Sequence, residues 1–179
     1  MLDPALREAL LIALSAMLLA GAWSKARNFP VWVATVAAYA LMPERAATGA
    51  GLIILALELI AGLLLIVPTA GIAGAVASLT VLAISTVAVV INLMRGRRDI
   101  RCGCGGIGAE QRLSWPLVAR NCILLAATYA TTLTVTARDL LFADHLVALA
   151  TAVGLAGLYA AANNVMANQP RLKSMRSSG

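Results

Sequence analysis

Charged and aromatic residues are scarce in this chain of 179 residues. Only 12% of the residues are charged and 4% are aromatic, whereas 61% are hydrophobic and the mean hydropathy is +0.87. A soluble domain has about a quarter of its residues charged. The polar surface is therefore too small to cover a globule in water, which excludes an ordinary soluble domain and favours an integral membrane protein.

Histidine and cysteine are also rare, with one histidine and three cysteines. Structural zinc needs four Cys or His ligands at close spacing, so we expect no metal site, although two thiolates alone suit a soft ion such as Cu(I). The net charge of +6 would suit nucleic acid. The basic residues instead lie between apolar runs, where they orient a protein in a lipid bilayer, so we expect no nucleic-acid partner.

Five apolar windows are long enough to cross a membrane. A bilayer core of about 30 Å needs about 20 apolar residues in a helix, and the windows are 6–23, 47–67, 72–94, 115–136 and 146–164. Backbone polar groups in lipid must be satisfied internally, which makes these segments helices. The sequence predicts an all-α, polytopic bundle of about five transmembrane helices, and the first window lacks a cleavage site, so we expect it to be retained.

A sixth apolar stretch, 29–42, has only 14 residues and is too short to span. We expect an interfacial or re-entrant half-helix there, with Trp32 and Tyr39 at the membrane interface. The bundle is predicted to form one domain over 1–168, followed by a basic, flexible tail at 169–179.

Small and polar residues recur on one face of two predicted helices, which favours close helix packing. The first set is Gly71, Ser78, Ser85 and Asn92, and the second set is Gly154, Gly157, Ala161 and Asn164.

A loop between the third and fourth windows holds a pair of thiols, Cys102 and Cys104, separated by one glycine. Glycine permits the backbone angles of so small a ring, and a strained disulfide would be labile and easily exchanged. Nearby arginines favour the nucleophilic thiolate; they include Arg97, Arg98 and Arg101. The alternative is a pair of ordinary loop cysteines.

Other polar residues lie within the predicted helices. Glu58 falls in the middle of the second window, where a carboxylate is costly and marks a site or a buried pair. Asn92, Arg120 and Asn121 are candidates for a polar cluster beneath the loop. Cys122 is either a third redox thiol or a small apolar filler.

Several motifs together resemble the family of the methylamine utilisation protein MauE, within the wider DoxX-like group. The resemblance rests on these segments: 91–100, 102–106, 113–121, 23–27, 57–59 and 159–163. One departure is Arg101, because the family often has an acidic residue before the first cysteine.

The resemblance implies an accessory protein for maturation (processing, export or disulfide formation) of the small, disulfide-rich subunit of methylamine dehydrogenase or a similar exported enzyme. It implies a thioredoxin-like partner, with Cys102 and Cys104 as the redox pair, in a bacterial inner membrane. By analogy with membrane thiol oxidases, a quinone is the candidate cofactor, and Glu58 would handle protons or help to bind it. Whether the chain is itself an enzyme, a thiol–disulfide oxidoreductase, stays open. The alternatives are a non-redox scaffold or export factor and a transporter of small solutes or metals.

The side on which the thiol loop lies is ambiguous. Of 14 Lys and Arg residues, only Arg7 and Arg138 fall on the side opposite the loop, and short loops rich in these residues stay in the cytoplasm. An exported client, in contrast, requires a loop that faces outward. We favour the outward loop because of the client's location; an inward loop would relay electrons from a cytoplasmic thiol donor.

Overall fold

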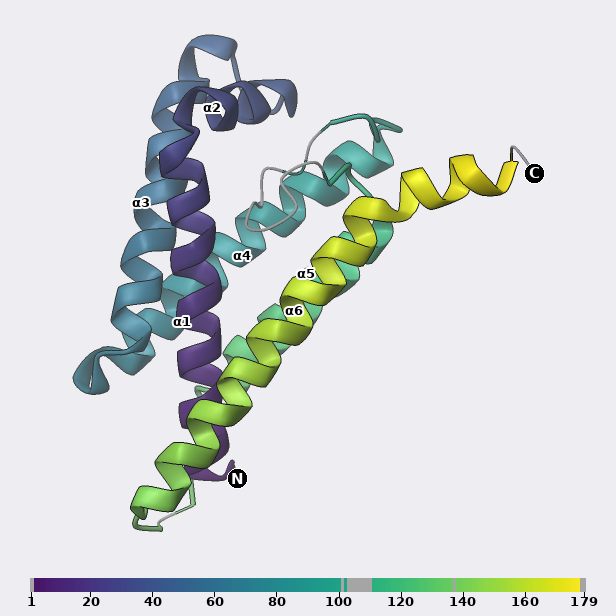
Figure 1. Cartoon of the computed structure of the whole chain (residues 1–179). Helices are drawn as coiled ribbons and strands as arrows, with labels where there is room; N and C mark the ends of the chain where they lie inside the picture. Colours follow the sequence, from purple (N-terminus) through teal and green to yellow (C-terminus); the bar gives the residue numbers. More distant parts are fainter. Residues whose placement is uncertain (1, 101, 103–110, 137, 178–179) are drawn as a thin grey trace.

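The computed structural model describes residues 2–100, 102, 111–136 and 138–177, which form mainly helices (Figure 1). They are α1 (Pro4–Arg27), α2 (Phe29–Ala38), α3 (Ala47–Leu65), α4 (Gly71–Met94), α5 (Trp115–Ala130) and α6 (Phe142–Ser177), with short 3-10 turns at Glu44–Ala46 and Pro68–Ala70. Asp3 caps α1 by accepting a hydrogen bond from the Ala5 amide at 2.8 Å. The predicted all-α architecture is confirmed.

Four segments of the described chain are long and apolar enough to cross a membrane: Pro4–Arg27, Glu44–Leu65, Pro68–Met94 and Phe142–Asn168. The fifth predicted span is shorter than its window, because α5 has 16 residues and ends at Ala130. At 1.5 Å per residue it is about 24 Å long. The hydroxyls of Thr131 and Thr132 then donate to carbonyls of the last helical turn, both at 2.7 Å. The membrane bundle thus has four full-length helices and one short one.

The half-helix is present as α2, which has 10 residues and lies across the ends of α1 and α3 (Figure 1). Trp32 and Tyr39, the residue after α2, are buried in the protein, and their expected place at the membrane interface stays a prediction. Trp32 is 9% exposed and Tyr39 is 8% exposed. Each is held inward by a hydrogen bond: the Trp32 indole donates to the Gly51 carbonyl at 3.0 Å, and the Tyr39 hydroxyl donates to the Cys102 carbonyl at 2.8 Å.

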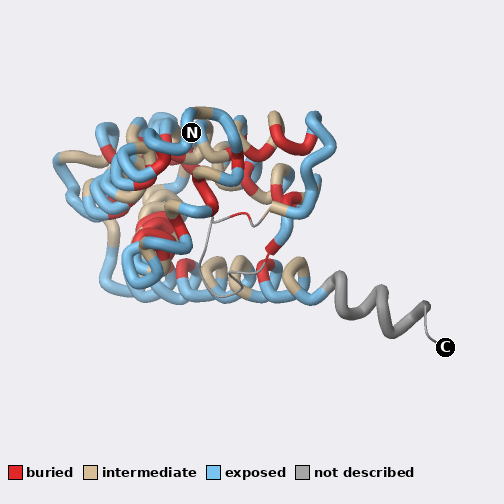
Figure 2. Tube along the Cα trace, turned by 90° about the horizontal axis from the view of Figure 1, so that it is seen from above, coloured by how far each residue is buried: buried red, intermediate tan, exposed pale blue. Residues whose placement is uncertain are grey.

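Helix α1 lies at the centre of the packing, against α2, α3, α5 and α6, while α4 packs on α3 and α5. The central apolar cluster contains Leu14, Leu18, Ala61, Leu65 and Val81. Large apolar side chains are exposed on the outside of the bundle. Most residues along the described part of α6 are exposed or half-buried (Figure 2). Such an apolar exterior suits lipid and not water.

The two predicted packing stripes have different outcomes. In α4, Ser78 and Asn92 are fully buried, as predicted, whereas Gly71 and Ser85 are only half-buried. In α6 the prediction is wrong, because Gly154 and Gly157 are exposed and a β-carbon on either would meet nothing within 4 Å. The buried face of α6 carries Ala148, Ala152 and Asn163 instead.

Beyond Asn168 the backbone of α6 continues as a helix to Ser177, into the segment predicted to be a tail. The division between a bundle at 1–168 and a flexible tail at 169–179 stays a prediction.

We expect Gly74→Ala to destabilise the bundle, because a β-carbon at Gly74 would lie 2.7 Å from the Leu65 backbone nitrogen. Overpacking of this kind costs about 1–3 kcal/mol. Gly154→Ala is the matched control on an open helix face and should stabilise the protein by about 0.5–1 kcal/mol, because alanine favours the helix more than glycine does. Thermal unfolding of both purified variants in detergent measures the difference. Equal melting temperatures would contradict the close α3–α4 contact.

Candidate functional site

Cys102 lies at the base of the loop that joins α4 to α5, and its backbone is held on both sides. Its amide donates to the Gln111 carbonyl at 2.8 Å, and the Leu113 amide donates to the Ile100 carbonyl at 3.1 Å. The carbonyl of Cys102 accepts the Tyr39 hydroxyl. The residue is 4% exposed and packs in an apolar cluster with Tyr39, Val89, Leu93, Leu113 and Leu117. The first cysteine of the pair is therefore fixed against the end of the bundle.

A first polar group lies beside Tyr39. The Arg97 guanidinium donates to the Tyr39 carbonyl at 3.3 Å and to the Asn92 side chain at 3.4 Å. Asn92, which is fully buried, donates back to the Ala88 carbonyl of its own helix at 3.0 Å. Arg97 thus ties the end of α4 to the segment after α2.

A second polar group lies on the other side of Cys102 and joins α5 to α6. The Arg120 guanidinium donates to Asn163 at 2.5 Å, to Asn121 at 3.0 Å and 3.3 Å, and to Gln111 at 3.5 Å. Gln111 in turn donates to the Asn163 carbonyl at 2.6 Å. The ring of Tyr159 lies 5.3 Å from the guanidinium, a cation–π distance. Arg120 is therefore surrounded by neutral partners.

Glu58 forms the buried pair that its position predicts, and the partner is Lys25 of α1, with 2.5 Å between the ammonium and the carboxylate. Their side chains are only 12% and 6% exposed. The Lys25 ammonium also lies 5.2 Å from the Trp32 ring. A β-carbon at Gly21 would come within 2.8 Å of the Glu58 carboxylate, so glycine at that position makes room for the pair.

A cavity of about 50 Å³ separates the ion pair from the second polar group; Lys25, Glu58, Arg120, Asn121 and Tyr159 line it. A water molecule needs roughly 10–15 Å³ of such space and two to four polar partners. The cavity has room for water between the Glu58 carboxylate and the Arg120 guanidinium.

The predicted polar cluster of Asn92, Arg120 and Asn121 is thus divided in two. Arg120 and Asn121 lie together, whereas Asn92 belongs to the Arg97 group. The two groups meet at Cys102 through its backbone contacts with Tyr39 and Gln111.

The remaining predicted site residues lie elsewhere. Arg98 is exposed. Cys122 is exposed on α5 and not a core filler. Arg101 and Cys104 lie outside the described residues.

Four contributors to the site are not predicted individually from the sequence: Gly21, Lys25, Gln111 and Asn163. The single acid in the second window is a signal that a cation is needed. Lys25, Tyr159 and Asn163 lie in the motif segments 23–27 and 159–163, whereas no motif contains Gln111.

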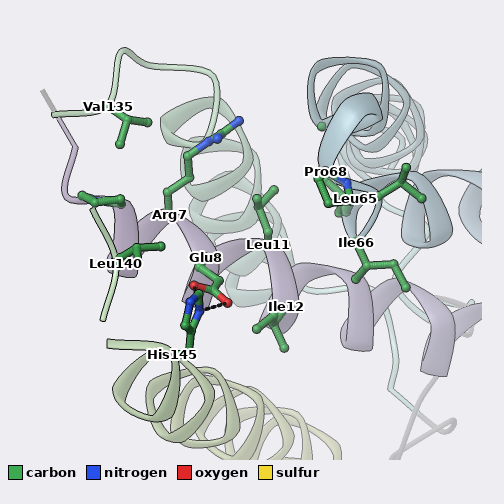
Figure 3. Close-up of a pocket in the computed structure, with 13 residues that line it drawn as sticks. Arg7, Glu8, Leu11, Ile12, Leu65, Ile66, Pro68, Val135, Leu140 and His145 are labelled. Atoms are coloured by element: carbon green, nitrogen blue, oxygen red, sulfur yellow. Dashed lines mark hydrogen bonds and ion pairs between the residues drawn. The ribbon is translucent and has the colours of Figure 1, made fainter. Parts of the chain in front are cut away.

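A cavity of about 560 Å³ lies at the opposite end of the bundle, lined mainly by apolar residues of α1, the α3–α4 turn and the segment around Leu140 (Figure 3). Within it Glu8 contacts His145 at 2.9 Å, with both side chains partly exposed. The described residues of the thiol loop do not line this cavity.

We expect Glu58→Gln to destabilise the protein by about 3–5 kcal/mol, because it leaves the Lys25 ammonium buried without its counter-charge. Replacing both residues by apolar ones, as in Lys25→Met/Glu58→Leu, should restore most of that loss. Glu8→Gln breaks an exposed pair and should cost about 1 kcal/mol or less. Unfolding in detergent micelles measures all three. A double variant no more stable than Glu58→Gln would show that the ion pair is not what matters at this position.

The family described as Methylamine utilisation protein MauE matches residues 4–136. That range contains α1 to α5, and so Lys25, Glu58, Cys102 and Arg120, but not α6. No solved structure matches the chain.

Three curated relatives share the name Methylamine utilization protein MauE. The protein of Paracoccus denitrificans is 32% identical over 130 residues, which are 73% of this chain and 70% of that protein. The Paracoccus versutus protein is 31% identical over 124 residues, 69% of this chain and 67% of that protein. The Methylorubrum extorquens protein is 33% identical over 113 residues, 63% of this chain and 61% of that protein. With four described helices able to cross a membrane and a family match over more than half of its length, the chain is a multi-pass membrane protein that belongs to the MauE family.

Proposed function

We propose that this protein takes part in methylamine utilisation as a membrane accessory protein that matures an exported client by thiol–disulfide exchange at Cys102 and Cys104. The client is the small, disulfide-rich subunit of methylamine dehydrogenase or a similar exported enzyme, and a thioredoxin-like protein is the redox partner. The names of the relatives support the pathway. The observation that carries the chemistry is the fixed position of Cys102 between two polar groups at one end of the bundle.

The burial of Cys102 gives the two cysteines different roles. With 4% of its surface exposed, Cys102 is inaccessible to the disulfide of another protein. Cys104 therefore forms the mixed disulfide with the partner, and Cys102 is the resolving thiol that attacks or leaves the Cys104 sulfur within the chain. Because Cys102 is buried, only Cys104 forms a disulfide with the partner protein, and Cys102 reacts with Cys104 alone.

The contacts of the basic residues support an outward loop in the bacterial inner membrane. The charge bias that favours the cytoplasm includes Lys25 and Arg120, and both are used inside the bundle. Arg95 and Arg97 donate to carbonyls of the segment after α2, at 3.4 Å and 3.3 Å. Because these charges have structural partners, the bias is a weaker guide to orientation than the sequence alone indicates, and the proposed exported client favours the outer side.

Replacing both cysteines, as in Cys102→Ser/Cys104→Ser, should abolish client maturation while leaving membrane insertion normal. Cys104→Ser alone should be as inactive as the double variant, and Cys102→Ser should accumulate a mixed disulfide with the client or the thioredoxin-like partner. Cys122→Ser, on an exposed face of α5, is the control and should retain activity. Client disulfides counted by thiol alkylation and mass spectrometry provide the measurement. Wild-type maturation in the double variant would refute thiol exchange.

A non-redox scaffold or export factor is the second candidate, and the packing of Cys102 in an apolar cluster favours it. In that case the thiol is a small core residue. Cys102→Ala would then support maturation fully, whereas Gly74→Ala, which disturbs helix packing, would impair it.

The side of the loop can be tested with a membrane-impermeant thiol reagent on spheroplasts after mild reduction, in the Cys122→Ala background. We expect labelling of Cys104 without permeabilisation, because the proposed client lies outside. A Cys102→Ser/Cys104→Ser/Cys122→Ala protein gives the background signal. Labelling that requires permeabilisation would place the loop in the cytoplasm and would remove direct exchange with an exported client.

A further inference from the structure

The small cavity beside the buried ion pair is lined by polar side chains from five helices, α1, α3, α4, α5 and α6. These side chains are Lys25, Glu58, Ser85, Arg120, Asn121 and Tyr159. The rest of the lining is mainly apolar and includes Leu14, Leu82 and Leu124. The volume of about 50 Å³ is far below the roughly 300–1,000 Å³ of pockets that hold organic ligands. The cavity therefore suits an ion of a few atoms or fewer, with water, and not a cofactor or a lipid headgroup.

Two hydrogen-bond donors that line the cavity have no partner in the described part of the chain. The side-chain oxygen of Asn121 accepts two N–H groups of Arg120, but the Asn121 amide nitrogen donates to none of the described residues. The Ser85 hydroxyl forms no hydrogen bond there either, whereas the Ser78 hydroxyl, two turns earlier on α4, donates to the Gly74 carbonyl at 2.7 Å. Asn121 is only 2% exposed, and a buried donor without an acceptor is costly.

The lining also has a net positive charge. Lys25 and Glu58 form a pair that is neutral as a whole, and Arg120 adds one positive charge. No carboxylate of the described residues forms an ion pair with Arg120. Its contacts with neutral amide side chains use four of its five N–H groups. An uncompensated charge inside a membrane bundle is costly, so the cavity favours an occupant that is both negative and a hydrogen-bond acceptor.

We propose that this cavity binds one small monovalent anion, of the size of chloride, between the Arg120 guanidinium, the Asn121 amide and the Ser85 hydroxyl. The anion accepts the N–H and O–H groups that the described residues leave unused, and its charge compensates that of Arg120. Glu58 does not oppose it, because its carboxylate already accepts the Lys25 ammonium at 2.5 Å. Water would satisfy the donors but would leave the charge. The bound ion would connect α4 to α5, and its binding does not depend on the proposed thiol chemistry.

Binding can be measured by equilibrium dialysis of the detergent-purified protein against radiolabelled chloride, with gluconate, which is too large for the cavity, as the background anion. We expect saturable binding of one chloride for each chain. Ser85→Ala should weaken it by about fivefold, the effect of one lost hydrogen bond. Ser78→Ala is the matched control, since Ser78 lies on the same helix, has its own partner and does not line the cavity; it should bind normally.

Absent or unsaturable chloride binding would overturn the assignment, because it would leave water as the occupant. Equal affinity of the Ser85→Ala and Ser78→Ala proteins would overturn it as well, since the ion would then bind elsewhere.

The location can be tested through Trp32, which lines the same cavity and is 9% exposed. The other two tryptophans, Trp23 and Trp115, are 65% and 53% exposed. In a Trp23→Phe/Trp115→Phe protein we expect bromide to quench the remaining fluorescence in a saturable way, because a heavy halide beside the indole quenches it, and chloride should reverse the effect. Quenching that rises linearly with bromide and ignores chloride would show that bromide acts from solution, and would refute a halide in this cavity.

Discussion

The buried ion pair between Lys25 and Glu58 is the interaction on which the arrangement of the first three helices depends. Two charges in a lipid-embedded bundle are stable only as partners, because each alone would have to be desolvated without compensation. Their contact fixes the height of α1 against α3, requires glycine at Gly21, and brings Trp32 of α2 over the ammonium. The half-helix is therefore held inward against α3 instead of lying freely at the membrane surface, and Tyr39 at its end reaches Cys102.

A second consequence is that the thiol segment is connected to several parts of the bundle. Tyr39 links Cys102 to α2, and Gln111 links it to Arg120 of α5 and to Asn163 of α6. None of these contacts joins two formal charges, so they provide geometry more than electrostatic energy. A reactive cysteine pair at this position would have one sulfur held still and buried while the other meets a partner.

Polar groups inside the bundle are concentrated near the end that carries the thiol loop. The small cavity between Glu58 and Arg120 places an acid and a fixed positive charge close together. The cavity at the other end, around Glu8 and His145, has no such connection to the described thiol segment. The polar side chains inside the described bundle are therefore distributed unevenly between its two ends.

The sequence alone was enough to predict the membrane class, the approximate positions of the helices and the shortness of the half-helix. Apolar length decides whether a segment can span a bilayer. The sequence also indicated that Glu58 needs a partner and that Arg120 and Asn121 lie in one polar group, although it wrongly placed Asn92 with them. Only the tertiary structure decided that the partner is Lys25, that Trp32 and Tyr39 are buried, and that the glycines of α6 face outward. The reason is physical: hydropathy is a property of each segment, whereas the partner of a charge and the buried side of a uniformly apolar helix depend on which helices lie beside it.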